Sequence, residues 1–231
     1  MRKKSRPSPD LHDETELKKN LLTYLLLAGF GLSLVAMVVH LRGYPFPGNQ
    51  EGYMPTQPIA FSHKLHAGTL EMNCLYCHSS AEKGPHAGFP PSSLCMNCHK
   101  IVHASWQVTR TEVEKARVEG RPQQRIVSPD LQKLYDALGL DAKLQPDPKK
   151  TPRPISWVKV HNLPAYTRFD HRAHVTKGVA CQECHGPVQT MEVMRQTSDL
   201  SMGWCLKCHK EHKDVNGKKV SPSTDCATCH Y

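Results

Sequence analysis

The sequence is poor in the side chains that normally build a protein core. Its 231 residues include only 5 Phe, 7 Tyr and 3 Trp, so that aromatic residues account for 6% of the chain, and the mean hydropathy is −0.52. A folded domain must bury a large apolar area to offset the conformational entropy that folding costs. This composition argues against a domain stabilised by its own side chains alone, and it predicts an interior filled by something other than protein.

The ten cysteines form one repeated pattern, and none is left over. Five times, two cysteines three positions apart are followed at once by histidine, which gives C-x-x-C-H. This pattern is the attachment signal for c-type haem, in which the cysteines form thioethers with the porphyrin and the histidine is the proximal iron ligand. We therefore predict five covalently bound c-type haems. The attachment cysteines are Cys74, Cys77, Cys95, Cys98, Cys181, Cys184, Cys205, Cys208, Cys226 and Cys229, and the proximal ligands are His78, His99, His185, His209 and His230.

Three other uses of paired cysteines fit the sequence less well. A zinc ribbon takes four ligands from two such pairs and does not need a histidine directly after each pair. A thioredoxin-like redox pair would occur once, within a βαβ pattern. A disulfide framework would leave the five histidines unexplained.

An apolar segment near the N-terminus predicts a membrane anchor. Residues 21–41 contain no Asp, Glu, Lys or Arg, and a helix of this length, about 31 Å, would cross the hydrocarbon core of a bilayer. Several Lys and Arg residues precede it, which favours a cytoplasmic N-terminus and a periplasmic location for the chain after Arg42. We expect a single-pass protein of the bacterial inner membrane with a periplasmic haem domain. The alternative is a cleaved signal peptide, although the run is long for one and no A-x-A site follows it.

The formal net charge of +9 does not by itself indicate a nucleic-acid partner. Each haem carries two propionates that the sequence does not count, so five haems would add about ten negative charges. We interpret the basic residues as compensation for these propionates, and we expect no nucleic-acid binding.

An internal repeat divides the haem-binding part of the chain into two modules. The unit F-x-H-x-x-H occurs at residues 61–66 and again at residues 169–174. The first unit precedes the first and second attachment sites, and the second unit precedes the third and fourth. The fifth site follows near the C-terminus. The sequence therefore predicts two two-haem modules and one additional haem.

Low-spin electron-transfer haems need a sixth iron ligand, so five distal groups must be found. Histidines three positions apart on a helical turn can point toward two neighbouring irons, and the two F-x-H-x-x-H units supply four of them. A fifth histidine lies just before the second unit. The predicted distal ligands are His63, His66, His161, His171 and His174.

Other residues remain open as distal ligands. A methionine in place of one histidine would give a Met/His haem of higher potential. The alternatives are the histidines His86, His103 and His212 and the methionines Met191, Met194 and Met202, whereas His12 and His40 lie outside the haem domain.

Composition and motif positions predict six parts of the chain. These parts are a cytoplasmic tail at 1–20, the anchor at 21–41, an extended lead at 42–58, the first two-haem module at 59–103, a connector at 104–160, and the second module with the fifth haem at 161–231. In the connector, Ser128 and Pro129 begin a short helix that Gly139 ends, and a proline-rich linker follows it. The expected fold class is a class III-like multihaem cytochrome c, mostly coil with short α-helices packed round five haems, plus one N-terminal transmembrane helix.

The combination of these features resembles a known family. The single anchor, the five C-x-x-C-H sites, the F-x-H-x-x-H units, WVKVHNLP at 157–164 and SMGW at 201–204 look like the pentahaem cytochrome c subunit of alternative complex III. The resemblance covers residues 20–231. It implies an electron-transfer subunit, not an enzyme by itself, of a membrane quinol:electron-acceptor oxidoreductase. It also implies the partners: a large iron–sulfur subunit, integral quinol-binding subunits and a monohaem cytochrome c. Electrons from quinol would pass through the haems to a cytochrome c or a terminal oxidase.

Two other functions remain open from the residues. A multihaem reductase would keep one haem iron open for its substrate, and the surplus of candidate ligands argues against it. A free-standing membrane multihaem quinol dehydrogenase would bind quinol itself beside the anchor. Carbon monoxide binding would favour the reductase, and quinol oxidation by the isolated chain would favour the dehydrogenase.

Overall fold

The computed structural model describes residues 11–43, 50–211, 214, 215 and 217–231. Contacts within the chain divide it into two units, residues 1–46 and residues 47–231. The division falls within the predicted extended lead, so the apolar N-terminal segment and the cysteine-rich part are separate units.

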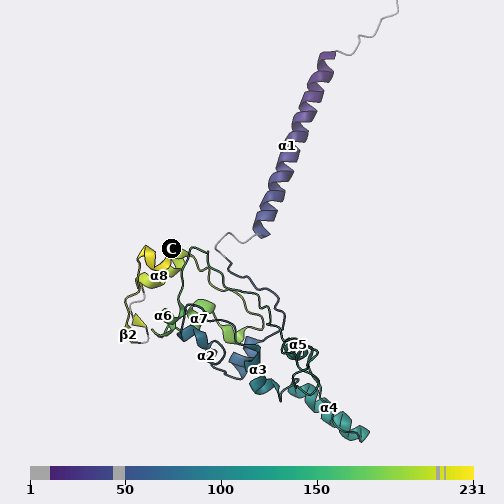
Figure 1. Cartoon of the computed structure of the whole chain (residues 1–231). Helices are drawn as coiled ribbons and strands as arrows, with labels where there is room; N and C mark the ends of the chain where they lie inside the picture. Colours follow the sequence, from purple (N-terminus) through teal and green to yellow (C-terminus); the bar gives the residue numbers. More distant parts are fainter. Residues whose placement is uncertain (1–10, 44–49, 212–213, 216) are drawn as a thin grey trace, which may run out of the picture. The chain divides into compact units, whose positions relative to one another are not determined.

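The first unit is dominated by one continuous helix, α1 (Leu11–Gly43), drawn in purple and blue in Figure 1. Residues 18–40 of this helix have a mean hydropathy of 2.2 in their most apolar window, and none of that window is buried within the protein. A helix of this length and composition can cross a membrane, and signal sequences share both properties. The predicted cytoplasmic tail is partly helical, because α1 begins at Leu11.

The second unit consists of short helices joined by long stretches without regular structure (Figure 1). Its elements are η1 (Lys64–Thr69, a π-helix), α2 (Cys74–Cys77), η2 (Ser79–Glu82), α3 (Ser92–His99), α4 (Trp106–Glu119), α5 (Pro129–Ala137), α6 (His171–Val175), α7 (Cys181–His185), η3 (Val188–Thr190), α8 (Met202–Glu211), β1 (Asp214–Val215), β2 (Lys218–Lys219) and α9 (Cys226–Cys229). Strands β1 and β2 pair antiparallel, with Asp214 opposite Lys219. The expectation of a mostly coil domain with short helices is confirmed.

The connector contains two helices, of which the sequence predicted α5 at its observed start. The Ser128 hydroxyl accepts a hydrogen bond from the backbone N–H of Leu131, and Pro129 occupies the first helical position. Gly139 follows with a φ of 68°, a left-handed conformation that glycine adopts easily. Helix α4 begins in the same way at Ser105 and ends at Gly120, whose φ is 64°.

The two predicted modules pack against each other reciprocally. In the first module, η1 contacts η3 of the second, and the backbone N–H of Lys64 donates to Met191 O at 2.9 Å. In the second module, α6 contacts η2 of the first, and the backbone N–H of Arg172 donates to Gly84 O at 3.2 Å. Lys64 and Arg172 occupy equivalent positions in the two F-x-H-x-x-H units. Each unit is therefore held by the chain that follows an attachment site of the other module.

Few side chains are buried in the part of the chain that the structure describes. The buried apolar residues are Ala81, Ala116, Leu134, Tyr135, Val160 and Met191, and the buried polar ones are Glu112 and Gln196. Three of the six apolar residues belong to helices α4 and α5. The two modules thus have almost no core of their own, as the low aromatic content predicts.

Candidate haem sites

Each C-x-x-C pair lies on a short helix: the first on α2, the second on α3, the third on α7, the fourth on α8 and the fifth on α9. Residues three apart in a helix share a face, so the two sulfurs of each pair can meet one porphyrin edge. Asn73 caps α2 by accepting a hydrogen bond from Leu75 N, and Asp225 caps α9 by accepting one from Ala227 N. Local capping therefore helps to shape these two single-turn helices.

The structure places none of the ten cysteines in a disulfide. Within the described residues, no group of three or more His, Cys, Asp or Glu side chains is arranged to hold a metal ion.

Three proximal histidines have the same hydrogen bond. Nδ1 of His78 lies 3.0 Å from Gly88 O, Nδ1 of His99 lies 2.8 Å from Val102 O, and Nδ1 of His209 lies 2.6 Å from Ser223 O. A carbonyl oxygen only accepts, so each Nδ1 carries the proton and donates it. The unprotonated Nε2 then has a lone pair available for iron, which is the arrangement that orients metal-bound histidines.

Three of the predicted distal histidines are held in the same way. Nδ1 of His66 lies 2.9 Å from Ser62 O, Nδ1 of His174 lies 2.9 Å from Asp170 O, and Nδ1 of His171 lies 2.7 Å from Pro85 O. His63 differs, because its Nδ1 is buried without a hydrogen-bond partner.

Predicted distal and proximal rings face each other at one characteristic separation. The ring centroids are 6.1 Å apart for His66 and His99 and 6.0 Å apart for His174 and His209. For His171 and His185 they are 6.3 Å apart. If each imidazole nitrogen were about 2.0 Å from one shared metal, the two centroids would be about 6 Å apart. The residues present therefore fit iron held between two imidazoles at these three sites.

The phenylalanine of each F-x-H-x-x-H unit has a structural role that the sequence analysis did not assign. Phe61 stacks on His66 at 4.4 Å and meets His63 edge-on at 5.0 Å. Phe169 stacks on His174 at 4.6 Å and meets His171 edge-on at 4.8 Å. Because the two units repeat this geometry, the aromatic ring is part of what orients both histidines. The recurrence of Phe at the first position of both units is the sequence feature that could have indicated this role.

Comparisons with known proteins agree with this geometry. Residues 167–231, which contain the third, fourth and fifth attachment sites, match the family described as cytochrome c7 and related cytochrome c. The matched residues, 167–231, therefore form a multihaem cytochrome c domain. The chain is also similar to a protein of Nitratidesulfovibrio vulgaris named menaquinone reductase, multiheme cytochrome c subunit, with 28% identity over 178 residues. The match covers 76% of this chain and 57% of the relative, so the chain spans little more than half of the relative's length.

Burial keeps several imidazoles of this multihaem cytochrome c neutral. Burial, together with the charges of His78 and His66, lowers the pKa of His63 to about 4. Burial likewise lowers the pKa of His185 to about 3 and that of His161 to about 4, with contributions from neighbouring histidines. A neutral imidazole is the form that binds a metal. The effect of His78 on His63 also indicates that these two rings are neighbours.

Attachment sites of the same module are neighbours. In the first module, the Asn97 amide donates to the Tyr76 hydroxyl at 2.9 Å and so joins α3 to α2. Burial, and then the charge of Cys77, raises the pKa of Cys95. In the second module, burial raises the pKa of Cys184 to about 11, and the nearby thiols of Cys208 and Cys205 add to the shift.

Two further contacts join the remaining sites of this cytochrome. The first and third sites are neighbours, because Cys74 contributes to the raised pKa of Cys181 after burial of that thiol. The fourth and fifth sites meet where His209 donates to Ser223 O, three residues before Cys226. The backbone N–H of Arg168 also donates to Cys229 O at 2.7 Å. The contacts give a row of sites in the order second, first, third, fourth and fifth.

Two predicted ligands have neighbours that the sequence did not identify. Nε2 of His161 lies 3.3 Å from Nδ1 of His185, with the two rings nearly perpendicular at 78°. The ring of His230 instead stacks on Tyr166, with centroids 5.9 Å apart, and Thr167 forms a β-bridge with His230. The structure therefore brings together His161 and the third site, whereas the residue beside the fifth proximal ligand is Tyr166.

The alternative ligands differ in exposure. His86 and Met202 are exposed, Met194 is half-buried and Met191 is buried. Of the two histidines expected outside the haem domain, His40 lies on α1 in the first unit. His212 and the side chain of His12 lie outside the described residues.

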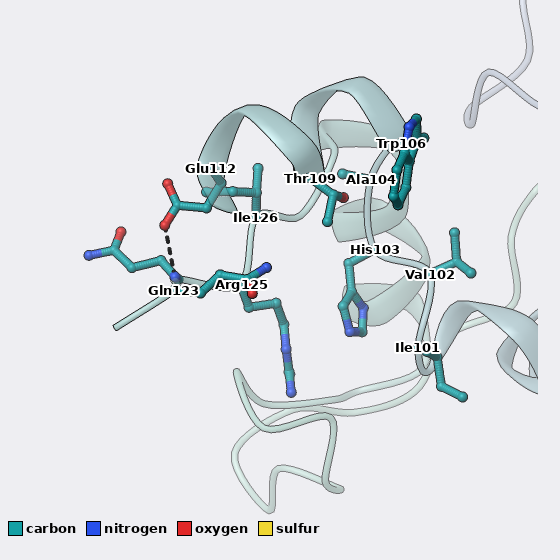
Figure 2. Close-up of a pocket in the computed structure, with 11 residues that line it drawn as sticks. Ile101, Val102, His103, Ala104, Trp106, Thr109, Glu112, Gln123, Arg125 and Ile126 are labelled. Carbon is teal, nitrogen blue, oxygen red and sulfur yellow. Dashed lines mark hydrogen bonds between the residues drawn. The ribbon is translucent and has the colours of Figure 1, made fainter. Parts of the chain in front are cut away.

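His103 forms a hydrogen bond with a residue of the connector. Its Nδ1 lies 3.0 Å from the hydroxyl of buried Tyr135, which itself donates to His99 O at 2.6 Å. His103 and Arg125 line a hollow of about 460 Å³. Figure 2 shows both residues together with Trp106 and Glu112 of helix α4, which line it as well. Burial, and then the charge of Arg125, lowers the pKa of His103. These contacts give His103 a structural role beside the second attachment site.

Proposed function

We propose that this multihaem cytochrome c conducts electrons through five c-type haems as a subunit of a membrane complex that oxidises quinol. The chain itself would not make or break bonds in a substrate. The five C-x-x-C-H sequences support the number of haems, and they account for every cysteine. The match of residues 167–231 to cytochrome c7 and related cytochromes c supports the type of cofactor.

The observation that carries this proposal is the pairing of imidazoles at about 6 Å. His66 with His99, His174 with His209, and His171 with His185 each leave room for one metal between two nitrogens. We assign His63 to the first site, because the other three histidines of the F-x-H-x-x-H units pair with the second, third and fourth sites. A site with two protein ligands has no position for a substrate, which favours electron transfer over catalysis.

The residues of the chain would fix each cofactor in three ways. The cysteine pairs would hold the porphyrin covalently, the two imidazoles would bind the metal, and the backbone carbonyls would orient the imidazoles. When bound, a haem supplies a one-electron centre whose potential depends on its axial ligands, its burial and nearby hydrogen bonds.

The order of the attachment sites supports a path for electrons along the domain. We propose that the second and fifth sites are the two ends, and that the first, third and fourth lie between them. In this order the modules meet through the first and third sites, where Cys74 influences Cys181. Electron exchange with partners is expected at the two ends.

Membrane attachment and partners are also part of the proposal. Helix α1 is long and apolar enough to act as an anchor, with the N-terminus in the cytoplasm and the haem domain in the periplasm. The proposed partners are an iron–sulfur subunit, integral quinol-binding subunits and a monohaem cytochrome c. The relative of N. vulgaris is named as a subunit of a menaquinone reductase, which supports a quinone-linked complex. We further propose that this complex is alternative complex III, which would oxidise quinol.

Purification of the full chain from membranes tests the proposal. We expect five covalent haems by mass spectrometry and pyridine haemochrome, low-spin ferric signals by electron paramagnetic resonance, and co-purification with larger subunits that reduce its haems when quinol is added. Quinol oxidation by the isolated chain would favour a free-standing dehydrogenase. Carbon monoxide binding by the reduced chain would favour a reductase with an open haem. Fewer than five covalent haems would contradict the proposal.

A further inference from the structure

His161 is a buried histidine that contacts a proximal ligand from behind. Its Nε2 lies 3.3 Å from Nδ1 of His185, and the two ring centroids are 4.4 Å apart. In a C-x-x-C-H site, Nε2 of the histidine faces the porphyrin, and Nδ1 points away from it across the ring. A group that touches Nδ1 of His185 therefore lies on the side opposite the haem of the third site.

The distal side of the third site is already occupied by another residue. The ring of His171 faces His185 at 6.3 Å and lies nearly parallel to it, at 9°. Its own Nδ1 donates to Pro85 O at 2.7 Å, so its Nε2 is the nitrogen that can bind iron. The third site thus has a proximal and a distal imidazole without His161.

Three other proximal histidines show what normally occupies the position of His161. Nδ1 of His78, His99 and His209 each donates to a backbone carbonyl, at distances of 2.6 to 3.0 Å. At the third site, the acceptor nearest to Nδ1 of His185 is the imidazole Nε2 of His161. A side chain has taken the place of a carbonyl.

We infer that His161 is a positioning residue, which accepts a hydrogen bond from Nδ1–H of His185 and thereby orients and tunes the third haem. The inference rests on the proposed function, because it requires His185 to bind haem iron. It gives His161 a role different from the distal ligand that the sequence suggested. The aromatic ring that lies beside His230, the fifth proximal histidine, is that of Tyr166.

The segment around His161 is built to hold this contact. Val160 is buried, and the amide of Asn162 donates to Gln50 Oε1 at 3.0 Å. For His185 to donate from Nδ1, Nε2 of His161 must carry a lone pair, which places the proton of His161 on its own Nδ1. A hydrogen-bond acceptor behind a metal-bound histidine raises the basicity of that ligand. A more basic ligand favours the ferric state, so the contact lowers the potential of the third haem.

Two variants of the full-length, haem-loaded protein separate the two roles of His161. His161→Leu removes both an acceptor and a possible ligand. His161→Gln cannot replace an axial imidazole, but its side-chain oxygen can accept a hydrogen bond from His185. We expect all haems to remain low-spin in both variants. We expect one haem to move to higher potential in His161→Leu, and to return most of the way to its original potential in His161→Gln. Val158→Ala, at an exposed side chain of the same segment, is the control for a substitution there, and it should leave the potentials unchanged.

The same measurements can overturn the inference. A high-spin ferric signal in both His161 variants would show that His161 is an axial ligand. Equal potential shifts in His161→Leu and His161→Gln would show that the hydrogen bond has no specific effect. A failure of the proposed function would be recognised separately, because the unaltered protein would then lack five covalent haems or low-spin spectra.

Discussion

The imidazole rings of His171 and His185 lie 9° from parallel, with their centroids 6.3 Å apart. Both residues belong to the second module, yet Nδ1 of His171 donates to Pro85 O of the first module at 2.7 Å. The distal face of the third site is therefore oriented by chain that follows the first site. This relationship couples the two modules at the centre of the proposed row of haems.

Replacing His171 with methionine should raise the potential of one haem and leave the others close to theirs. A thioether is a weaker donor to ferric iron than imidazole, so Met/His ligation favours the ferrous state. Spectroelectrochemical titration of the purified full-length protein would resolve the shifted component. His86→Met, at an exposed histidine, is the control. If no component moves in His171→Met, then His171 is not an axial ligand.

Adding one methyl group at Gly68 should destabilise the contact between the modules. A Cβ at this position would collide with the backbone carbonyl oxygen of Gln189 in η3, where η1 packs. Overpacking against backbone typically costs about 1–3 kcal/mol, so we expect a lower melting temperature for Gly68→Ala.

The matched control for Gly68→Ala is Gly84→Ala. Gly84 lies in the equivalent contact between α6 and η2, but a Cβ there would meet nothing within 4 Å. Thermal unfolding followed by haem absorbance should separate the two variants. If Gly68→Ala and the unaltered protein have equal melting temperatures, then the η1–η3 contact accommodates the added methyl group without loss of stability.

Some of this architecture could be read from the sequence because its determinants are local. The attachment helices follow from cysteines three positions apart, and α5 follows from Ser128, Pro129 and Gly139. The scarcity of buried side chains follows from composition, which needs no knowledge of the fold.

Other features could not be predicted, because they depend on contacts between distant segments. Nothing near His171 in the sequence identifies Pro85 O as its acceptor, and nothing near His161 identifies His185 as its neighbour. The sequence could suggest that both are ligands from their residue type and spacing. It could not say on which side of another imidazole each would lie.

The helix α4 should lose stability in acid through one carboxylate. Hydrogen bonds from Arg121, and then from the backbone N–H of Gln124, lower the pKa of Glu112 from 4.5 to about 2. A group whose pKa is lower in the folded state stabilises the fold above its unfolded pKa, and the effect is lost as the pH falls through the folded pKa. We therefore expect progressive loosening of residues 106–124 between about pH 4.5 and pH 2.

Hydrogen exchange measured by mass spectrometry and corrected for intrinsic rates would detect this loosening. Glu112→Gln should expose residues 106–124 to faster exchange already at neutral pH and should flatten the acid response. Glu114→Gln is the control, because its ion pair with Arg117 is exposed on the same helix and should contribute little. An unchanged acid profile in Glu112→Gln would assign the loosening to another group.

The pairing of His66 with His99 and of His174 with His209 can be tested by removing ligands and attachment sites together. Their ring separations of 6.1 and 6.0 Å predict that His66 serves the second site and His174 the fourth. His66→Gly should leave one haem high-spin by electron paramagnetic resonance, because one axial position is open, and added imidazole should restore the low-spin signal. In a background with Cys95→Ala and Cys98→Ala, which removes the second haem, His66→Gly should produce no high-spin signal. His174→Gly should still produce one in that background, since its partner site is intact. The reverse result would assign His66 and His174 to each other's haems.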